Sequence, residues 1–332
     1  MPARPLRLAI VAALLLPAAC GGGNPAETPG PAEYVPGRSY FGDGGHVEYV
    51  AGDLPLVFAA PHGGTMTPAS IPARVAGPAC GPEVTTVRDA NTEELVREIR
   101  LAFLERTGGQ PHIVINRLHR SRLDANRAIG EAACGQAVAE RAWSDYHGFI
   151  DRARSAVTVS HGRGFFTDVH GHGHAIQRLE LGYDLSASTL RRPDAELDAD
   201  PAVERASTIH RLSDWSPLSF SALLRGERSL GARFAAAGYP AVPGAQDPAP
   251  DEGEPYFSGG YSAERHSCAV GGSVCGVQIE ANMAGVRDDA GNRRRFALAL
   301  VEVYHAYLTE SGVPLPALRP AGSSSRAGPP AR

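Results

Sequence analysis

The stretch GFFTDVHGHG, residues 164–173, joins an apolar run to a close-set group of polar side chains. The apolar run predicts a buried strand, and the glycines among the histidines indicate that the strand ends there. Alternation along a strand would place His170, His172 and His174 on one face. These three could bind zinc alone, but the end of the strand favours His170 as a metal ligand, with Asp168 supporting it and the later histidines in or beside a cleft.

Other apolar runs have the same form, and helical patterns lie between them. The predicted strands are LPLVFAAPHGG (54–64), HIVINRL (112–118) and CGVQIEANM (275–283). The predicted helices cover residues 91–108, 141–157 and 293–312. Strands that alternate with helices predict an α/β fold, with a mostly parallel or mixed central sheet and helices on both faces. In such sheets functional side chains gather where strands end.

The two ends of the chain differ in composition from the middle. Residues 1–20 have a basic start, a short apolar run and small residues before Cys20, as in a bacterial lipoprotein signal that is cut before a lipid-bearing cysteine. A plain secretory signal is the alternative, and both place the protein in the cell envelope or outside the cell. We expect a flexible tether over 21–37, one α/β domain over 38–312 and a disordered tail over 313–332. Residues 185–265 are expected to form an irregular insertion, a connecting helix with a long loop that either covers the site or is a surface excursion.

Composition excludes some partners. The 332 residues are 43% hydrophobic and 20% charged, as in an ordinary globular protein, with a formal net charge of −4. This balance gives no reason to expect nucleic acid or an anionic membrane surface as a partner. We therefore expect membrane contact only through a lipid on Cys20. All 32 basic residues are arginine, so an arginine is assigned a role only inside a motif.

The remaining cysteines are even in number, as expected in an oxidising compartment. Cys268 and Cys275 flank a short glycine-containing loop, which favours a disulfide between them. Cys80 and Cys134 are then paired by elimination.

Four polar groups could carry chemistry, and each has a structural alternative. His62 directly follows a predicted strand and precedes two glycines that let a ligand approach, but it could also be a capped turn histidine. Asp89 heads the predicted helix at 91–108, where it could instead act as a cap. Residues 116–127, NRLHRSRLDANR, offer arginine forks for a carboxylate or else form a surface ion-pair cluster. Glu280, near the end of an apolar strand, is either paired with an arginine or a general base.

The order of these motifs resembles the N-formylglutamate amidohydrolase family, which is similar in fold to the zinc carboxypeptidases and aspartoacylases. The resemblance covers about residues 55–305. The motifs follow one another in this order: PHGG, an acid that heads a helix, SRLDANR, DVHGHG and a final IE. The resemblance implies one Zn²⁺ per chain, held by His62, His170 and a carboxylate. Thr65 stands where the zinc carboxypeptidases have a glutamate, so Asp89 is chosen as the third ligand, with Glu93 in reserve and His172 and His174 as alternative metal or cleft residues.

The resemblance also implies a reaction. Glu280 would be the general base, and Arg122 would polarise the scissile carbonyl. The substrate clamp would consist of Asn116, Arg117, Asn126 and Arg127. We therefore expect a zinc-dependent hydrolase that cleaves an amide bond in an N-acyl amino acid or a peptide with a free carboxylate. The alternatives are an exported lipoprotein that binds a metal or small carboxylate without catalysis, and a histidine store for zinc or copper.

Overall fold

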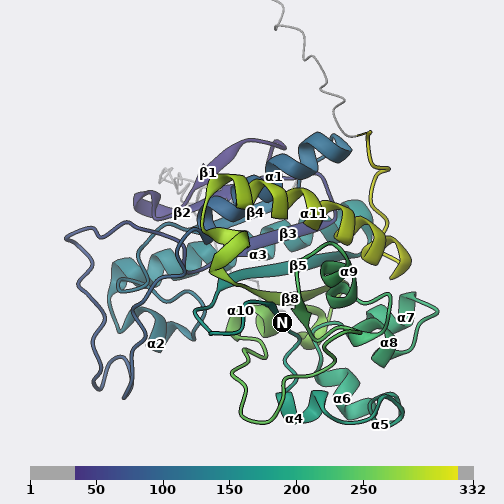
Figure 1. Cartoon of the computed structure of the whole chain (residues 1–332). Coiled ribbons are helices and arrows are strands. Elements are labelled where there is room, and N and C mark those ends of the chain that lie inside the picture. Colours follow the sequence, from purple (N-terminus) through teal and green to yellow (C-terminus); the bar gives the residue numbers. More distant parts are fainter. Residues whose placement is uncertain (1–33, 321–332) are drawn as a thin grey trace, which may run out of the picture.

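The computed structural model describes residues 34–320, which form one mixed sheet with helices on both faces (Figure 1). The predictions for the signal peptide, Cys20, most of the tether and the end of the tail lie outside the described residues. The sheet has eight strands in the order β1-β2-β4-β3-β5-β8-β6-β7. Their bounds are Ser39–Phe41 (β1), Val47–Val50 (β2), Leu56–Ala60 (β3), His112–Asn116 (β4), Gly164–Gly171 (β5), Leu179–Gly182 (β6), Ala241–Val242 (β7) and Val274–Ala281 (β8).

The central strands run parallel to one another. β4, β3, β5 and β8 are neighbours with the same direction, whereas β2 and β6 pair antiparallel with β4 and β8. The predicted α/β class with a mixed sheet is confirmed. Because β3, β5 and β8 all point the same way, the segments that follow them meet at one edge of the sheet.

The sheet has an apolar core on each of its two faces, which is why helices cover both faces. Successive side chains of a strand point to opposite faces, so Phe165 of β5 packs into one core and Phe166 into the other. The first core includes α1 (Thr92–Thr107) and α11 (Ala290–Glu310), which lie side by side in Figure 1. The second includes α2 (Ile129–Ala133) and α3 (Ala137–His161). The long helices predicted from periodicity are therefore present.

The insertion is more regular than the expected loop. Its short helices are Ala187–Leu190 (α4), Asp194–Asp198 (α5), Pro201–Ala206 (α6), Leu212–Trp215 (α7), Phe220–Arg225 (α8), Leu230–Ala236 (α9) and Tyr261–His266 (α10). Most of them lie at one end of the molecule in Figure 1, whereas the last of them, α10, packs against β5 and β8. Serine side chains cap α4, α8 and α9, which satisfies backbone N–H groups that such short helices would otherwise leave free. Three single turns complete the chain: Asp43–Gly45, Cys268–Val270 and Met283–Arg287.

The folded part extends beyond the expected limits of 38 and 312. At the amino-terminal end, the ring of Tyr34 lies 5.2 Å from that of Tyr49. At the other end Val313 is fully buried, and the Arg319 N–H donates to the Arg106 carbonyl. Residues 313–320 therefore pack on the domain instead of forming a free tail. Among the described helices, none combines the length and apolar character needed to cross a bilayer.

The structure contains the disulfides Cys80–Cys134 and Cys268–Cys275. The first closes a loop of 54 residues, and the second a loop of 7. Cross-linking costs the unfolded chain more entropy when the loop is longer. Disulfides of this kind persist in oxidising compartments.

Removing the longer cross-link should destabilise the protein. The double variant Cys80→Ala/Cys134→Ala is expected to lose about 4 kcal/mol of unfolding free energy, by loop entropy alone. Urea titration followed by circular dichroism measures this loss. Dithiothreitol also reduces Cys268–Cys275, so wild type and variant should have the same midpoint when both are reduced. An unchanged midpoint of the variant in oxidising buffer would contradict the expectation.

Candidate metal centre

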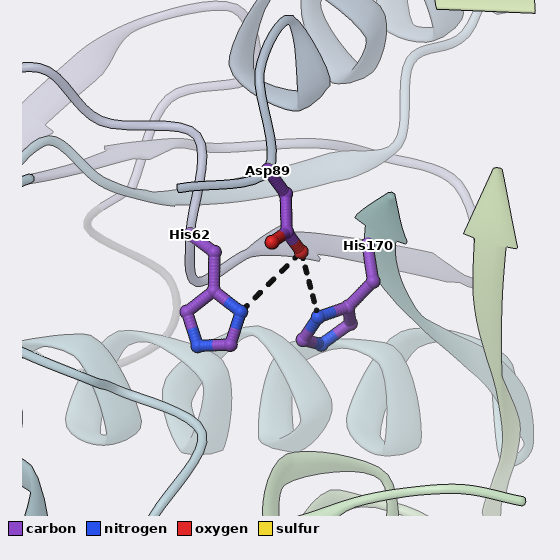
Figure 2. Close-up of side chains that lie close together, drawn as sticks. All are labelled: His62, Asp89 and His170. Carbon is purple, nitrogen blue, oxygen red and sulfur yellow. Dashed lines mark hydrogen bonds and ion pairs between the residues drawn. The ribbon is translucent and has the colours of Figure 1, made fainter. Parts of the chain in front are cut away.

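Three side chains far apart in the sequence meet at the carboxyl edge of the parallel strands (Figure 2). His62 follows β3, Asp89 precedes α1 and His170 lies near the end of β5. All three are buried, and one ligand atom from each lies within 4.8 Å of the others. The tight turn after β3 requires glycine, because a Cβ on Gly63 would come within 2.5 Å of the Glu93 nitrogen. That turn places His62 against the head of α1 and hence beside Asp89.

The spacing of these atoms suits a tetrahedral metal ion. Asp89 Oδ2 lies 3.4 Å from Nδ1 of His62 and 3.1 Å from Nδ1 of His170. Two donors that each bind zinc at its usual distance are about 3.4 Å apart in a tetrahedral site. Both histidines therefore present the same ring nitrogen, Nδ1, toward one carboxylate oxygen.

The opposite ring nitrogens are held by two further carboxylates. Nε2 of His62 lies 2.6 Å from Asp124 Oδ1, and Nε2 of His170 lies 2.8 Å from Asp168 Oδ2. A carboxylate only accepts, so each Nε2 carries its hydrogen and each Nδ1 is left with a lone pair when the ring is neutral. Histidine ligands of metals commonly have such a partner. The Nδ1 of His62 is buried and has no hydrogen-bond partner among the described residues, as expected of an atom meant for an ion.

Without a metal, a hydrogen bond between His170 Nδ1 and Asp89 joins two members of the group. Burial raises the pKa of Asp89, but His62 and His170 outweigh it and hold that pKa well below its usual range. Burial lowers the pKa of His170, but Asp168 and Asp89 outweigh it and hold that pKa well above its usual range. A divalent ion would replace the proton on His170, so metal binding should release protons.

Glu280 stands beside this group on the neighbouring strand. Register pairs it with His170 across β5 and β8, and its Oε1 lies 3.9 Å from His170 Nδ1. Ile279 points into the apolar core, as alternation requires. Burial raises the pKa of Glu280 to about 7, against the opposing charges of His170 and His62. A buried carboxyl with such a pKa beside a candidate metal position is suited to proton transfer near neutral pH.

A cavity of about 380 Å³ opens above these residues. Arg120, Asn126 and Arg127 line it together with the candidate ligands and Glu280. Arg120 bonds Asp124 through Nε at 3.0 Å and lies 3.5 Å from Asp89. Arg127 is exposed, and the one hydrogen bond that its guanidinium makes to a described residue runs from Nη1 to the Asn126 carbonyl. The cavity therefore has a metal-type donor set on its floor and a guanidinium at its rim.

Several predicted clamp residues lie elsewhere. Asn116 is fully buried, and its amide donates to the Pro61 carbonyl, so it supports the turn before His62. Arg117 donates to the Gly45 carbonyl, and Arg122 donates to the Ile71 carbonyl. None of these three lines the cavity. Arg120, and not Arg122, lies beside Asp89 and Asp124 and lines the cavity, so Arg122 is not placed to polarise a scissile carbonyl there.

The reserve ligand Glu93 is also outside the group. Its carboxylate pairs with Arg97 one helical turn later, at 2.9 Å. His172 and His174 line the cavity wall next to Phe257, apart from the group that Figure 2 shows.

Two positioning residues were not found from sequence. Arg287 is buried and donates to the carbonyls of Ala90, His172 and Ala281, which ties three segments around the site. Gln278 lines the cavity and donates to Glu280 Oε1 at 3.0 Å. The period of two along β8 was the signal available for Gln278, because it predicts that residues 278 and 280 share a face. No local pattern marks Arg287.

Comparisons with known proteins found similarity to solved structures alone, since no protein-family model and no curated protein matches the chain. An N-formylglutamate amidohydrolase from Ralstonia eutropha JMP134 is 14% identical, with a TM-score of 0.47 over 77% of this chain and 96% of that one. A gene product from Agrobacterium tumefaciens is 13% identical, with a TM-score of 0.48 over 80% and 95%. The N-acetylmuramyl-L-alanine amidase of Mycobacterium smegmatis is 15% identical, with a TM-score of 0.31 over 76% and 96%. The first of these structures bears the name of the family that the sequence motifs resemble.

Proposed function

We propose that this chain is an exported, zinc-dependent hydrolase that cleaves an amide bond in an N-acyl amino acid or a peptide with a free carboxylate. The observation that carries the proposal is the pairing of a two-histidine, one-carboxylate donor set with a buried carboxyl next to it. Donor sets of this kind leave a position open for water or substrate in catalytic zinc sites. A purely storage site has no use for Glu280, whose Oε1 lies 3.9 Å from His170 Nδ1.

The chain's own residues divide the work. Glu280 takes a proton from the attacking water, and Gln278 holds the Glu280 carboxyl in place through its amide N–H. Arg127 at the rim binds the free carboxylate of the substrate, because a guanidinium keeps its charge at any working pH. Arg120 lies close enough to the candidate ligands to stabilise negative charge that develops on the carbonyl oxygen. Zinc, when bound, would polarise the carbonyl and make water a better nucleophile.

Export is part of the proposal. Two disulfides favour an oxidising compartment, and residues 1–20 resemble a signal of the lipoprotein or secretory kind. Acylated amino acids outside the cell or peptides of the cell wall are the substrate classes that this location favours.

Metal removal tests the function directly. Purified protein is expected to contain close to one zinc per chain and to hydrolyse members of an N-formyl and N-acetyl amino acid panel. Dialysis against a chelator should abolish hydrolysis, and stoichiometric zinc should restore it, as ninhydrin detection of the released amine would show. Metal content by mass spectrometry and the panel are measured together. A metal-loaded protein that is inert toward the whole panel would favour a binding protein instead.

A further inference from the structure

A second polar group lies on the wall of the same cavity, apart from the candidate metal ligands. It consists of His172, His174, Glu180 and Phe257, and we name it the wall cluster. Glu180 of β6 is almost fully buried, and both of its oxygens are used. Oε1 lies 2.7 Å from Nδ1 of His174, and Oε2 accepts the Phe257 N–H at 2.8 Å. The His174 and Phe257 rings stack with their centroids 4.7 Å apart.

These contacts fix one nitrogen of His174 and leave the other for a ligand. Nδ1 donates to Glu180, because a carboxylate only accepts. Among the described residues, none hydrogen-bonds Nε2 of His174. The ring itself is held on one side by Phe257, and both residues line the cavity. A carboxylate that orients an imidazole in this way is the arrangement by which enzymes set a proton-transfer histidine.

The hydrogen bonds of His172 argue against a second metal ion. His172, His174 and Glu180 have ligand atoms within 4.8 Å of one another, which by itself would allow one. The Nε2 of His172, however, donates to the Arg178 carbonyl at 2.8 Å, and its Nδ1 accepts the His174 N–H at 3.1 Å. Both nitrogens of His172 are therefore already used, so this residue supports the wall cluster and does not offer a free donor.

The wall cluster is close to the reacting groups. Register places Glu180 directly opposite Glu280 in the antiparallel pair of β6 and β8. His174, which lies in the loop between β5 and β6 and bonds Glu180, thus faces the same cavity as Glu280. His170 of β5 lies on the other side of Glu280 from Glu180. Two proton-transfer groups on different walls can act on opposite sides of a bound amide.

We propose that His174 is the proton donor to the departing amine. The inference rests on the proposed amide hydrolysis and adds to it a second catalytic residue, with Glu180 and Phe257 as positioning residues. Glu280 removes a proton from water while the oxygen of that water forms a bond to the carbonyl carbon. When the carbonyl re-forms, the C–N bond breaks, and nitrogen keeps the bonding pair and takes the Nε2 proton of His174, which must carry a hydrogen on both ring nitrogens before this step and keeps the one on Nδ1. His174 regains a proton from solvent, and Glu280 releases to solvent the proton that it took from water. One water is consumed, and no oxidant or reductant is needed.

Substrates with different leaving groups test whether His174 supplies this proton. An amine must be protonated to leave, whereas a carboxyphenolate leaves as the anion. The variant His174→Gln is expected to lose about 100-fold or more in kcat/KM on N-acyl amino acids. On matched acyloxybenzoates, which also carry a free carboxylate, the same variant should stay within about fivefold of wild type. Glu180→Gln should show the same pattern to a smaller degree, because it only orients the ring.

Controls separate this role from a structural one. His161→Gln changes an exposed histidine at the end of α3 and should leave both substrates unaffected. Thermal melting checks that each variant folds, and nitrogen-15 NMR of the imidazole rings reports whether Nδ1 of His174 carries a hydrogen bonded to Glu180, independently of activity.

Each other outcome overturns the inference. If His174→Gln lowers kcat/KM equally on both substrate types, His174 acts in substrate binding or in folding. Two zinc ions per chain in wild type, with one lost in His174→Gln, would make the wall cluster a metal site. A wild type that cleaves neither substrate type would remove the proposed function and this inference with it, whereas wild-type cleavage with an unaffected variant removes the inference alone.

Discussion

Glu280→Gln is expected to lower kcat by about 10²–10⁴-fold on the amide panel, the usual contribution of a positioned general base. Glutamine has nearly the same shape and can keep a contact with Gln278, but it cannot accept a proton from water. The zinc content should remain close to one per chain, because Glu280 is beside the donor set and is not one of the three grouped ligands. Steady-state kinetics and metal analysis on the same preparation measure both effects.

The pH dependence of kcat/KM provides a second test of Glu280 as the general base. Burial raises the pKa of Glu280 to about 7, and a base must be deprotonated to act, so kcat/KM should rise with pH up to that region. A bound divalent ion favours the carboxylate and would shift this limb to lower pH. The limb should be absent from the residual activity of Glu280→Gln.

Glu93→Gln is the matched control. It removes a carboxylate at the head of α1, which pairs with Arg97 outside the cavity. Full activity and full metal content in this variant are expected. If hydrolysis survives in Glu280→Gln, another residue is the general base. If Glu93→Gln loses metal, Glu93 is a metal ligand after all.

The sheet could be predicted because strands that are buried on both faces must have apolar sequences. Strands β3, β4, β5 and β8 are buried on both faces, which requires apolar runs such as LVFAA and HIVIN. Polar residues that follow such runs must gather at one edge, because parallel strands end there together. That reasoning predicts polar groups together at the strand ends, and the resemblance of the motifs to a known family singled out His62, His170 and Glu280 among them.

The cluster at 116–127 could not be resolved from sequence, for a physical reason. After β4 the chain passes through turns, so no period of two or of 3.6 tells which arginine faces inward. Arg120 and Arg122 are indistinguishable in the motif, although the structure places only Arg120 against Asp89 and Asp124.

His172 and His174 of the wall cluster were expected near the cleft, but Glu180 and Phe257 were not found from sequence, for another reason. Phe257 comes from the insertion, and its place depends on Glu180, 77 residues earlier in the chain. Helices of four to seven residues, such as α4 to α9, are too short to leave a periodic pattern. Contacts that join an irregular segment to a short strand have no signature in either sequence alone.

His62→Ala and His170→Ala are each expected to lower zinc affinity by more than about 100-fold, since loss of even an outer hydrogen-bond partner of a ligand costs about 10–100-fold. Asp124→Asn changes the partner of His62 Nε2, which Arg120 also contacts, and leaves the three ligands in place, so its loss should fall within that smaller range. Competition with a chromophoric chelator measures the affinities. The zinc-dependent rise in melting temperature provides a second measure, because an ion that binds only the folded state stabilises it.

His172→Gln completes this series, because it changes a histidine two residues from His170 whose ring nitrogens are both used in hydrogen bonds to backbone groups. It should keep zinc affinity close to that of wild type. A histidine store would instead lose zinc equally in all three histidine variants. If His62→Ala and His170→Ala bind zinc as tightly as wild type, the donor set is wrong. The buried Nδ1 of His62 would then need another explanation, because leaving such a group unpaired costs about 1–3 kcal/mol.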